Sequence, residues 1–254
     1  MTTAIITGAS RGIGRAAAIE MSHNPEVDNI VLIATNAEKL SETSELLNPR
    51  VSVWEVIYDF SSQDGIAEMV KEIYEEFGSI DWLLNIAGYT DPKSLLDTTI
   101  ESMHKTYNVN VFSLVALTKE CVKYMKKNGE SKILNVASTA GMSPRPGWLS
   151  YASSKSAVIS ISETLALELA EYNILVYCIS PGRAATDLRR KLAPEEDPTT
   201  IMQPEHVAKV IGKLMRMSEQ FLDGQNMVVR KQVRPVSKSS IENKKASESI
   251  SITN

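Results

Sequence analysis

Short apolar runs alternate with longer amphipathic segments along most of the chain. The short runs contain mainly Val, Ile and Leu without a polar alternation, which is typical of strands buried on both faces of a parallel sheet. The longer segments have the length and spacing of helices. Strands are predicted over Thr3–Thr7, Ile30–Ala34, Val51–Ile57, Trp82–Ile86, Lys132–Ala137, Ile174–Ile179 and Asn226–Val229. Helices are predicted over Gly14–Ser22, Ala37–Leu47, Gln63–Phe77, Ile100–Lys127, Tyr151–Ala170 and Pro204–Met217.

This strict alternation predicts the α/β fold class. Because strand–helix–strand crossovers are right-handed, they build one doubly wound (Rossmann) sheet of about seven parallel strands with helices on both faces. We expect this domain to span residues 1–230. After Arg230 the composition shifts to Ser, Lys, Glu and Asn, and residues 231–254 are predicted to be a polar, disordered tail. The alternative for the tail is a partner-binding peptide.

Composition narrows the possible classes of protein. Of the 254 residues 43% are hydrophobic, enough for a sizeable core, and a formal net charge of -4 argues against a nucleic-acid partner. No apolar stretch is long enough to span a bilayer. The N-terminus enters a strand-like run at once, without the basic and apolar regions of a signal peptide. We therefore expect a soluble, cytoplasmic protein without a membrane partner.

Neither the cysteines nor the histidines indicate a separate site. Cys121 lies on a predicted helix and Cys178 in an apolar run, so two reduced thiols are the favoured interpretation, with a disulfide between them as the alternative. The three histidines lack the spacing of metal ligands, and we predict no metal site.

A glycine-rich turn joins the first strand to the first helix and reads Thr7-Gly8-Ala9-Ser10-Arg11-Gly12-Ile13-Gly14. Glycines in such a turn let backbone N–H groups approach a pyrophosphate, and the helix N-terminus adds favourable partial charge. The first gap is wider than in the GxGxxG pattern, and the alternative is an ordinary tight turn. Three glycines in seven positions directly after the first strand favour a dinucleotide site.

Charge after the second strand bears on which dinucleotide is bound. An NAD site usually places a carboxylate there to bind the ribose 2′-hydroxyl, but this strand ends in Ala34-Thr35-Asn36 without an acid. Arg11 could pair with a 2′-phosphate, helped by Thr35 or Asn36. The alternative is that Arg11 is a solvated loop residue. NADP(H) is therefore the preferred cofactor, and NAD(H) is the second possibility.

Tyr151-Ala-Ser-Ser-Lys155 opens a predicted helix, and the i, i+4 spacing places the tyrosine and the lysine on one face. A nearby ammonium group favours the phenolate and lowers a tyrosine pKa, which suits a proton donor or acceptor. Such pairs on helices are also commonly structural. Ser138 ends the fifth strand, at the edge of the sheet where α/β proteins bind ligands, and its hydroxyl could bind a substrate carbonyl. By itself it would more often be a turn serine.

Taken together, these motifs resemble those of the short-chain dehydrogenase/reductase family, in its compact single-domain form, from Thr3 to about Val229. The glycine-rich turn is similar to the family's TGxxxGIG loop, Tyr151 and Lys155 fit its YxxxK motif, and Ser138 stands at the usual distance before the tyrosine. Asn110 fits the helix asparagine of the catalytic tetrad. The other matches are Asp59 after the third strand, Asn85-Ile86-Ala87-Gly88 at the NNAG motif, and Pro181-Gly182 with Thr186 at the PG motif.

The resemblance implies a role for each position. Tyr151 would be the general acid in reduction and the base in oxidation, and Lys155 would lower its pKa and hold the nicotinamide ribose. Ser138 would orient the substrate carbonyl, and Asn110 would hold a water of the proton relay. The implied cofactor-binding residues are Thr7, Gly8, Ser10, Arg11, Gly12, Ile13, Gly14, Thr35, Asn36, Asp59, Asn85, Ala87, Gly88, Tyr151, Lys155, Pro181, Gly182 and Thr186.

The predicted function is an NAD(P)-dependent oxidoreductase that transfers a hydride between NADPH and a carbonyl or secondary alcohol substrate. Reduction of a 3-oxoacyl thioester, as in 3-oxoacyl-carrier-protein reductase-like members, and reduction of a small ketone or sugar-like carbonyl are the candidate reactions. The resemblance also implies a homodimer or homotetramer. The alternative function is a catalytically silent NADP(H)-binding regulatory protein.

Two features bear on the substrate. Arg183, Arg189 and Arg190 lie in the segment that forms the substrate lid in similar proteins, and they could favour an anionic substrate, with solvated lid charge as the alternative. Trp148 lies in the loop before Tyr151, and it is either a packing anchor for the loop or an apolar wall of the substrate site.

Overall fold

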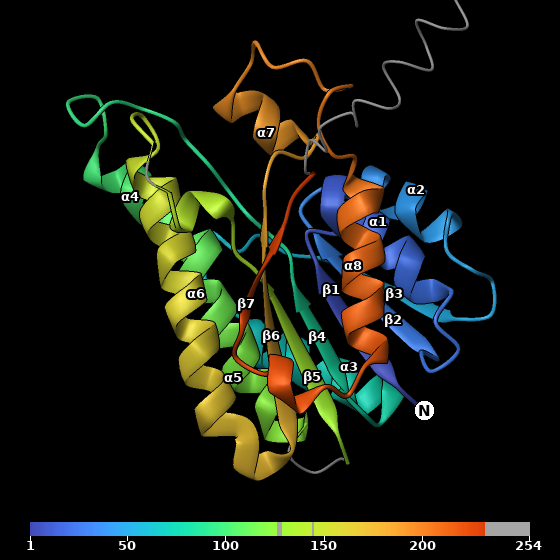
Figure 1. Ribbon diagram of the computed structural model, residues 1–254. Coiled ribbons are helices and arrows are strands. Elements are labelled where there is room, and N and C mark those ends of the chain that lie inside the picture. Colours follow the sequence, from blue (N-terminus) through green and yellow to red (C-terminus); the bar gives the residue numbers. More distant parts are fainter. Residues whose placement is uncertain (126–128, 144, 232–254) are drawn as a thin grey trace, which may run out of the picture.

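The computed structural model describes residues 1–125, 129–143 and 145–231. Its strands form one parallel sheet in the order β3-β2-β1-β4-β5-β6-β7 (Figure 1). The chain starts at β1, moves outward to β3, crosses back to β4 and continues outward to β7. This arrangement confirms the predicted doubly wound α/β fold. The strands are β1 (Thr3–Thr7), β2 (Asn29–Ala34), β3 (Ser52–Ile57), β4 (Trp82–Asn85), β5 (Ser131–Val136), β6 (Ile174–Pro181) and β7 (Asn226–Val229).

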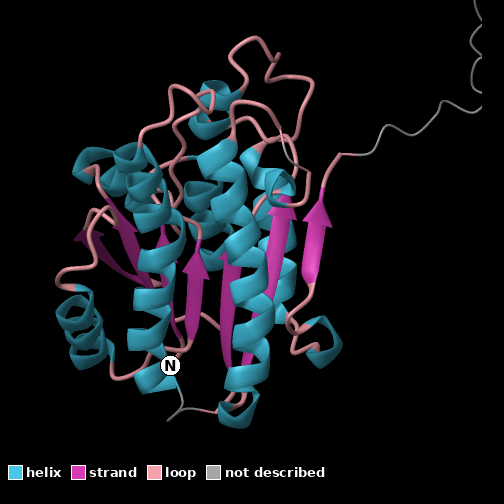
Figure 2. Ribbon diagram, turned by 90° about the vertical axis from the view of Figure 1, so that its left-hand side faces the viewer, coloured by secondary structure: helices cyan, strands magenta, loops and turns pink. Residues whose placement is uncertain are grey.

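Helices cover both faces of the sheet (Figure 2). One face carries α1 (Gly12–Ser22), α2 (Ala37–Glu45) and α8 (Pro204–Arg216). The other carries α3 (Ile66–Phe77), α5 (Ser113–Met125) and α6 (Leu149–Leu169), and α4 (Ile100–Tyr107) packs against α6. A short helix, α7 (Asp187–Leu192), lies beyond the carboxyl ends of the strands (Figure 1).

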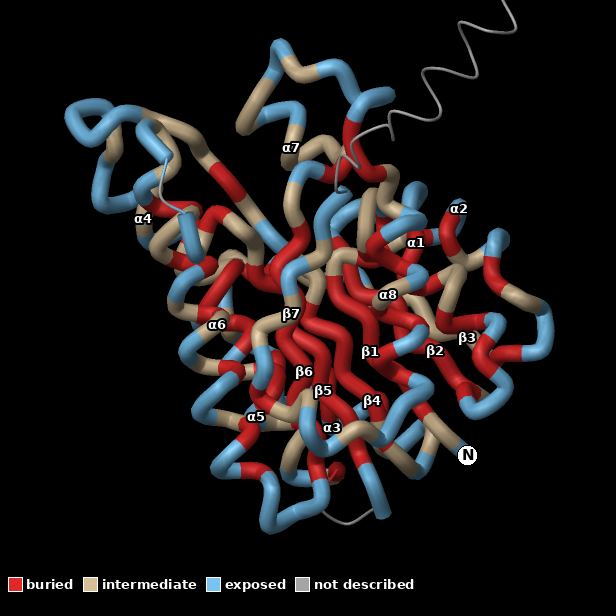
Figure 3. Tube along the Cα trace, in the orientation of Figure 1, coloured by how far each residue is buried: buried red, intermediate tan, exposed pale blue. Residues whose placement is uncertain are grey.

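The core consists of two apolar layers, one on each side of the sheet. In β1, Ala4 and Ile6 belong to the layer under α1 and α8, whereas Ile5 belongs to the layer under α3 and α5. Figure 3 shows the buried trace following the central strands. Each fully buried aliphatic side chain contributes about 1.5–3 kcal/mol. Because the strand interiors are occupied by packing, polar chemistry is confined to the strand ends and the loops that follow them.

The predicted helix Ile100–Lys127 is wrong in one respect. A π-helical turn, Asn108–Phe112, interrupts it and separates α4 from α5. Such turns carry one extra residue and shift the side chains that follow. The helix α7 was not predicted, because six residues rich in charge carry no apolar periodicity. The predicted tail beyond residue 231 lies outside the described residues.

Both cysteines are free and buried, which confirms the reduced interpretation over a disulfide. Among the described residues, no helix combines the length and the apolar character needed to cross a membrane.

Candidate active site

One cavity of about 400 Å³ opens at the carboxyl ends of the strands. It extends from the glycine-rich turn to the N-terminal half of α6, and α7 lies across it. The sheet order reverses between β1 and β4 at this edge, which is where doubly wound sheets bind their ligands. The lining includes most of the predicted cofactor residues: Gly8, Ser10, Arg11, Gly12, Ile13, Gly14, Thr35, Asp59, Ala87, Gly88, Tyr151, Lys155, Pro181, Gly182 and Thr186.

The glycine-rich turn is folded too tightly for side chains at two of its positions. Gly8 has φ +69°, and a Cβ there would lie 2.9 Å from the Cα of Ala87. A Cβ on Gly14 would lie 2.1 Å from the carbonyl oxygen of Gly8. The turn therefore presses against the end of β4, and the first N–H groups of α1 remain at the wall of the cavity. This backbone cradle fits a dinucleotide pyrophosphate.

Thr7 stabilises the backbone next to the cradle and does not line the cavity. Its hydroxyl accepts hydrogen bonds from the backbone N–H groups of Ile86 at 2.9 Å and of Ala87 at 3.0 Å. It thereby ties the end of β1 to the turn after β4. Its predicted role as a cofactor contact stays a prediction.

The side chains of Asn36 and Asn85 are also engaged elsewhere. Asn36 caps α2 by accepting from the N–H of Lys39 at 2.8 Å. Asn85 is buried and donates to Asn135 at 2.9 Å and to Thr118 at 3.1 Å. Both remain predicted cofactor residues, although neither lines the cavity.

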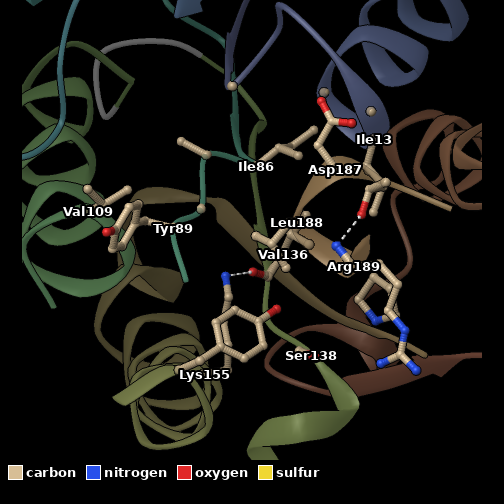
Figure 4. A pocket seen from close by; sticks show the side chains of 18 of the residues that line it. Ile13, Ile86, Tyr89, Val109, Val136, Ser138, Lys155, Asp187, Leu188 and Arg189 are labelled. Atoms are coloured by element: carbon tan, nitrogen blue, oxygen red, sulfur yellow. Dashed lines mark hydrogen bonds between the residues drawn. The ribbon is translucent and has the colours of Figure 1, made fainter. Parts of the chain in front are cut away.

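Three of the predicted catalytic residues meet at the floor of the cavity. Ser138 follows β5, and its hydroxyl lies close enough to Tyr151 on α6 to lower the tyrosine pKa. Tyr151 and Lys155 are both buried. The Lys155 ammonium reaches into the cavity and donates to the carbonyl oxygen of Val136 at 2.7 Å (Figure 4). Burial lowers the pKa of Lys155 to about 8.

The electrostatics of Tyr151 differ from the sequence-based expectation. Burial raises its pKa, while the hydrogen bond with Ser138 and the charge of Arg189 act in the opposite direction. The Lys155 ammonium donates instead to the carbonyl oxygen of Val136. At neutral pH the phenol therefore carries its proton, which suits a general acid.

Asn110 reaches the same place from the π-helical turn. It is 1% exposed, its Oδ1 accepts from the N–H of Tyr89 at 2.8 Å, and its Nδ2 donates to the carbonyl of Tyr89 and to Ser154. A Cβ built on Gly88 would lie 3.7 Å from the Asn110 Oδ1 and 3.8 Å from the Lys155 Nζ. Asn110 and Lys155 thus converge on Gly88, and the extra residue of the π-helical turn places Asn110 there.

The lid arginines are paired with carboxylates. Glu196 binds Arg189 through two hydrogen bonds, at 2.5 and 2.9 Å, and binds Arg183 at 3.1 Å. Arg190 is paired with Asp187, which also binds Arg11 at 3.0 Å. Arg189 and Glu196 are each 14% exposed. Each of the three arginines that the sequence suggested for an anionic substrate is therefore paired with a carboxylate, although Glu196 and Asp187 are shared between them and Arg11.

Trp148 lines the cavity and contacts Tyr151 edge to face, with ring centroids 6.4 Å apart. The guanidinium of Arg189 lies 5.5 Å from the Trp148 ring. Trp148 therefore forms a wall of the site as well as holding its loop. The lining residues that sequence reasoning did not single out include Tyr89, Lys105, Arg145, Leu188 and Leu192. They stand in loops or on helix surfaces without a motif.

No cluster of three or more metal-ligating side chains occurs among the residues described.

Comparisons with known proteins agree with this geometry. A family model for short chain dehydrogenases matches residues 2–197. The 3-oxoacyl-[acyl-carrier-protein] reductase of Thermotoga maritima is 31% identical over 234 residues, which cover 87% of this chain and 93% of that protein. The crystal structure of NAD⁺-bound xylitol dehydrogenase has a TM-score of 0.81 at 26% identity and covers 91% of this chain and 98% of its own. L-sorbose reductase from Gluconobacter frateurii, complexed with NADPH and L-sorbose, has a TM-score of 0.81 at 26% identity. The match covers 89% of this chain and 94% of that protein. The two solved proteins hold different dinucleotides, so similarity alone does not select one.

Proposed function

Because the chain belongs to the short-chain dehydrogenase/reductase family, we propose that it reduces a carbonyl group to a secondary alcohol with NADPH and catalyses the reverse oxidation with NADP⁺. The family assigns it to the oxidoreductases that act on CH–OH or carbonyl groups. One observation supports carbonyl reduction with NADPH: the candidate catalytic residues lie together beside the same cavity that the glycine-rich cradle lines. These residues are Asn110, Ser138, Tyr151 and Lys155.

Each of the four residues has a task in reduction. The hydroxyls of Ser138 and Tyr151 are close enough to share a carbonyl oxygen, so Ser138 orients the carbonyl and Tyr151 donates the proton to the oxygen. The nicotinamide supplies the hydride when bound. Lys155, with its pKa near 8, holds the ribose hydroxyls and returns a proton toward Tyr151. Asn110 holds the loop after β4 through Tyr89, and its role in holding a water beside Lys155 stays a prediction.

The preference for NADPH is supported by the charges around the cradle. Thr35 follows β2 and lines the cavity, and no acid stands at that turn. Arg11 also lines the cavity and is 59% exposed, held only by its pair with Asp187 within the described chain. Exposed pairs of this kind contribute about 0–1 kcal/mol, so a phosphate can replace Asp187 at little cost.

The cofactor preference is tested by comparing NADPH and NADH in fluorescence titrations. Arg11→Met is expected to weaken NADPH binding about tenfold or more and to leave NADH nearly unchanged. Asp187→Asn frees the guanidinium and is expected to improve NADPH binding up to about fivefold. Equal weakening of both dinucleotides by Arg11→Met would refute the assignment of Arg11 to the 2′-phosphate.

Catalysis is tested with Tyr151→Phe. NADPH absorbance is followed with a panel of ketones, aldehydes and 3-oxoacyl thioesters, with NADH in parallel. The variant is expected to lose turnover by about a hundredfold or more while it still binds NADPH. An intact tetrad disfavours the alternative of a silent NADP(H)-binding regulator. That alternative would gain support if the wild-type protein bound NADPH but oxidised none with any carbonyl.

The cytoplasmic location and the homodimer or homotetramer stay predictions. Light scattering after size-exclusion chromatography determines the oligomeric state directly.

A further inference from the structure

Two cations that line the cavity have no carboxylate partner among the described residues. Lys105 comes from α4 and Arg145 from the loop before α6, and both line the cavity. Within the described part of the chain, neither has a carboxylate within 4.0 Å. Glu101 stands one helical turn before Lys105 but does not pair with it. This contrasts with the lid, where Arg183, Arg189 and Arg190 are all paired.

Each of the two cations is placed by an aromatic ring. The Lys105 ammonium lies 5.1 Å from the ring centre of Tyr89, and the Arg145 guanidinium lies 5.3 Å from that of Trp148. Cation–π contacts of this kind hold a charge in place without neutralising it. Both residues are exposed, and the ring contacts leave their positive charge available to a ligand.

The same rings connect the cations to the reaction centre. Tyr89 is held through its backbone by Asn110, and its side chain lies on the cavity wall beside Val109 (Figure 4). Trp148 contacts Tyr151 edge to face. Each cation thus contacts the ring of a residue that is itself joined to a candidate catalytic residue, Tyr89 to Asn110 through its backbone and Trp148 to Tyr151 through its ring.

The two walls are also fastened to each other. The N–H of Lys93, in the loop after β4, donates to the carbonyl of Gly147 at 2.9 Å, and Lys93 pairs with Trp148 in a short parallel bridge. The nearby acid Asp91 is occupied by the ammonium of Lys93 at 2.8 Å and the hydroxyl of Ser102 at 2.7 Å. It is therefore not available to neutralise either of the two free cations.

We propose that Lys105 and Arg145 form an anion subsite, and that the substrate is a carbonyl compound carrying a carboxylate or phosphate at the end remote from the carbonyl. The proposal rests on the reductase function proposed above. The carbonyl lies at Ser138 and Tyr151, the connecting carbons pass between the rings of Tyr89 and Trp148, and the anionic end reaches the two cations.

The test uses levulinate and its longer homologues, each compared with its methyl ester, so that shape is kept and only the charge is removed. At low ionic strength the acid of suitable length is expected to have a kcat/KM about tenfold above that of its ester. In about 1 M salt, where the screening length falls to about 3 Å, the ratio should approach one. A homologue bearing phosphate in place of the carboxylate identifies which anion is preferred.

Variants assign the effect to the two side chains. Lys105→Met and Arg145→Gln are each expected to lower the acid-to-ester ratio by roughly two- to fivefold, and the double variant should abolish the preference. Lys71→Met is the matched control. It removes an exposed cation on α3, remote from the cavity, and should leave the ratio at its wild-type value.

Binding is measured without turnover through the fluorescence of Trp148, with Trp148→Phe identifying its share of the signal. If acids and esters bind and react equally, or if the double variant keeps the preference, the anion subsite is refuted while carbonyl reduction stands. If acids bind more tightly than esters through Lys105 and Arg145 but no carbonyl compound oxidises NADPH, the subsite stands and the reductase function is refuted.

Discussion

Gly141→Ala tests how strictly the backbone positions the catalytic hydroxyls. Gly141 follows Ser138 in the short turn after β5, and its carbonyl accepts a hydrogen bond from the Ser156 hydroxyl of α6 at 2.6 Å. A Cβ at this glycine would lie 2.7 Å from the carbonyl carbon of Lys155 and 2.7 Å from the backbone nitrogen of Ser156. Both atoms are backbone, so no flexible side chain can give way.

The turn must therefore retreat from α6 by roughly 0.7 Å to reach ordinary van der Waals contact near 3.4 Å. Ser138 moves with the turn, whereas Tyr151 stays with the helix. A displacement of this size in a reacting pair costs roughly ten- to a hundredfold in kcat. The overpacked contact lowers the free energy of unfolding by about 1–3 kcal/mol.

The assay compares kcat for the best carbonyl found in the screen, the Kd for NADPH by fluorescence, and the urea unfolding midpoint. Affinity for NADPH should change less than threefold, because the glycine-rich cradle is not touched. Gly129→Ala is the matched control, since nothing lies within 4 Å of a Cβ at that position. A kcat within twofold of the wild type, together with an unaltered unfolding midpoint, would show that the contact between the turn and α6 does not position Ser138.

Three further changes test other parts of the site. Lys155→Met should abolish most turnover yet raise the free energy of unfolding at pH 7 by about 1–3 kcal/mol, because burial holds the lysine pKa near 8, below its ordinary 10.5. Urea titrations should show this gain in the free energy of unfolding shrinking as the pH rises from about 8 to 10.5. A gain that is constant with pH would contradict the lowered lysine pKa. Glu196→Gln should lower the free energy of unfolding by about 1–2 kcal/mol at neutral pH, because the hydrogen bond from Arg189 holds the pKa of Glu196 below its ordinary value. The free energies of unfolding of wild type and variant should converge as the pH falls through that lowered pKa. A difference that stays constant with pH would count against the pairing. Gly14→Ala should weaken dinucleotide binding at least roughly tenfold, because its Cβ would overlap the carbonyl of Gly8, and an undiminished affinity would exclude this cradle as the binding site.

The sequence by itself determined the sheet and most of the site. Uninterrupted apolar runs such as Ile30–Ala34 can only be buried on both faces, so the parallel order with covering helices follows from local composition. The motifs around Gly8 and Tyr151 predicted where the glycine-rich turn and the candidate catalytic residues lie, because these features depend on backbone conformation and on helical spacing within a few residues.

Tertiary structure alone decided which charges are free. The sequence shows no partner for Arg189, yet in the structure Glu196, seven residues later, accepts two hydrogen bonds from it. Lys105 and Arg145 carry no motif, and they line one cavity only because the segments after the neighbouring strands β4 and β5 begin at the same edge of the sheet. Pairing between charges depends on distances of a few ångströms across separate elements, which periodicity along the chain does not encode.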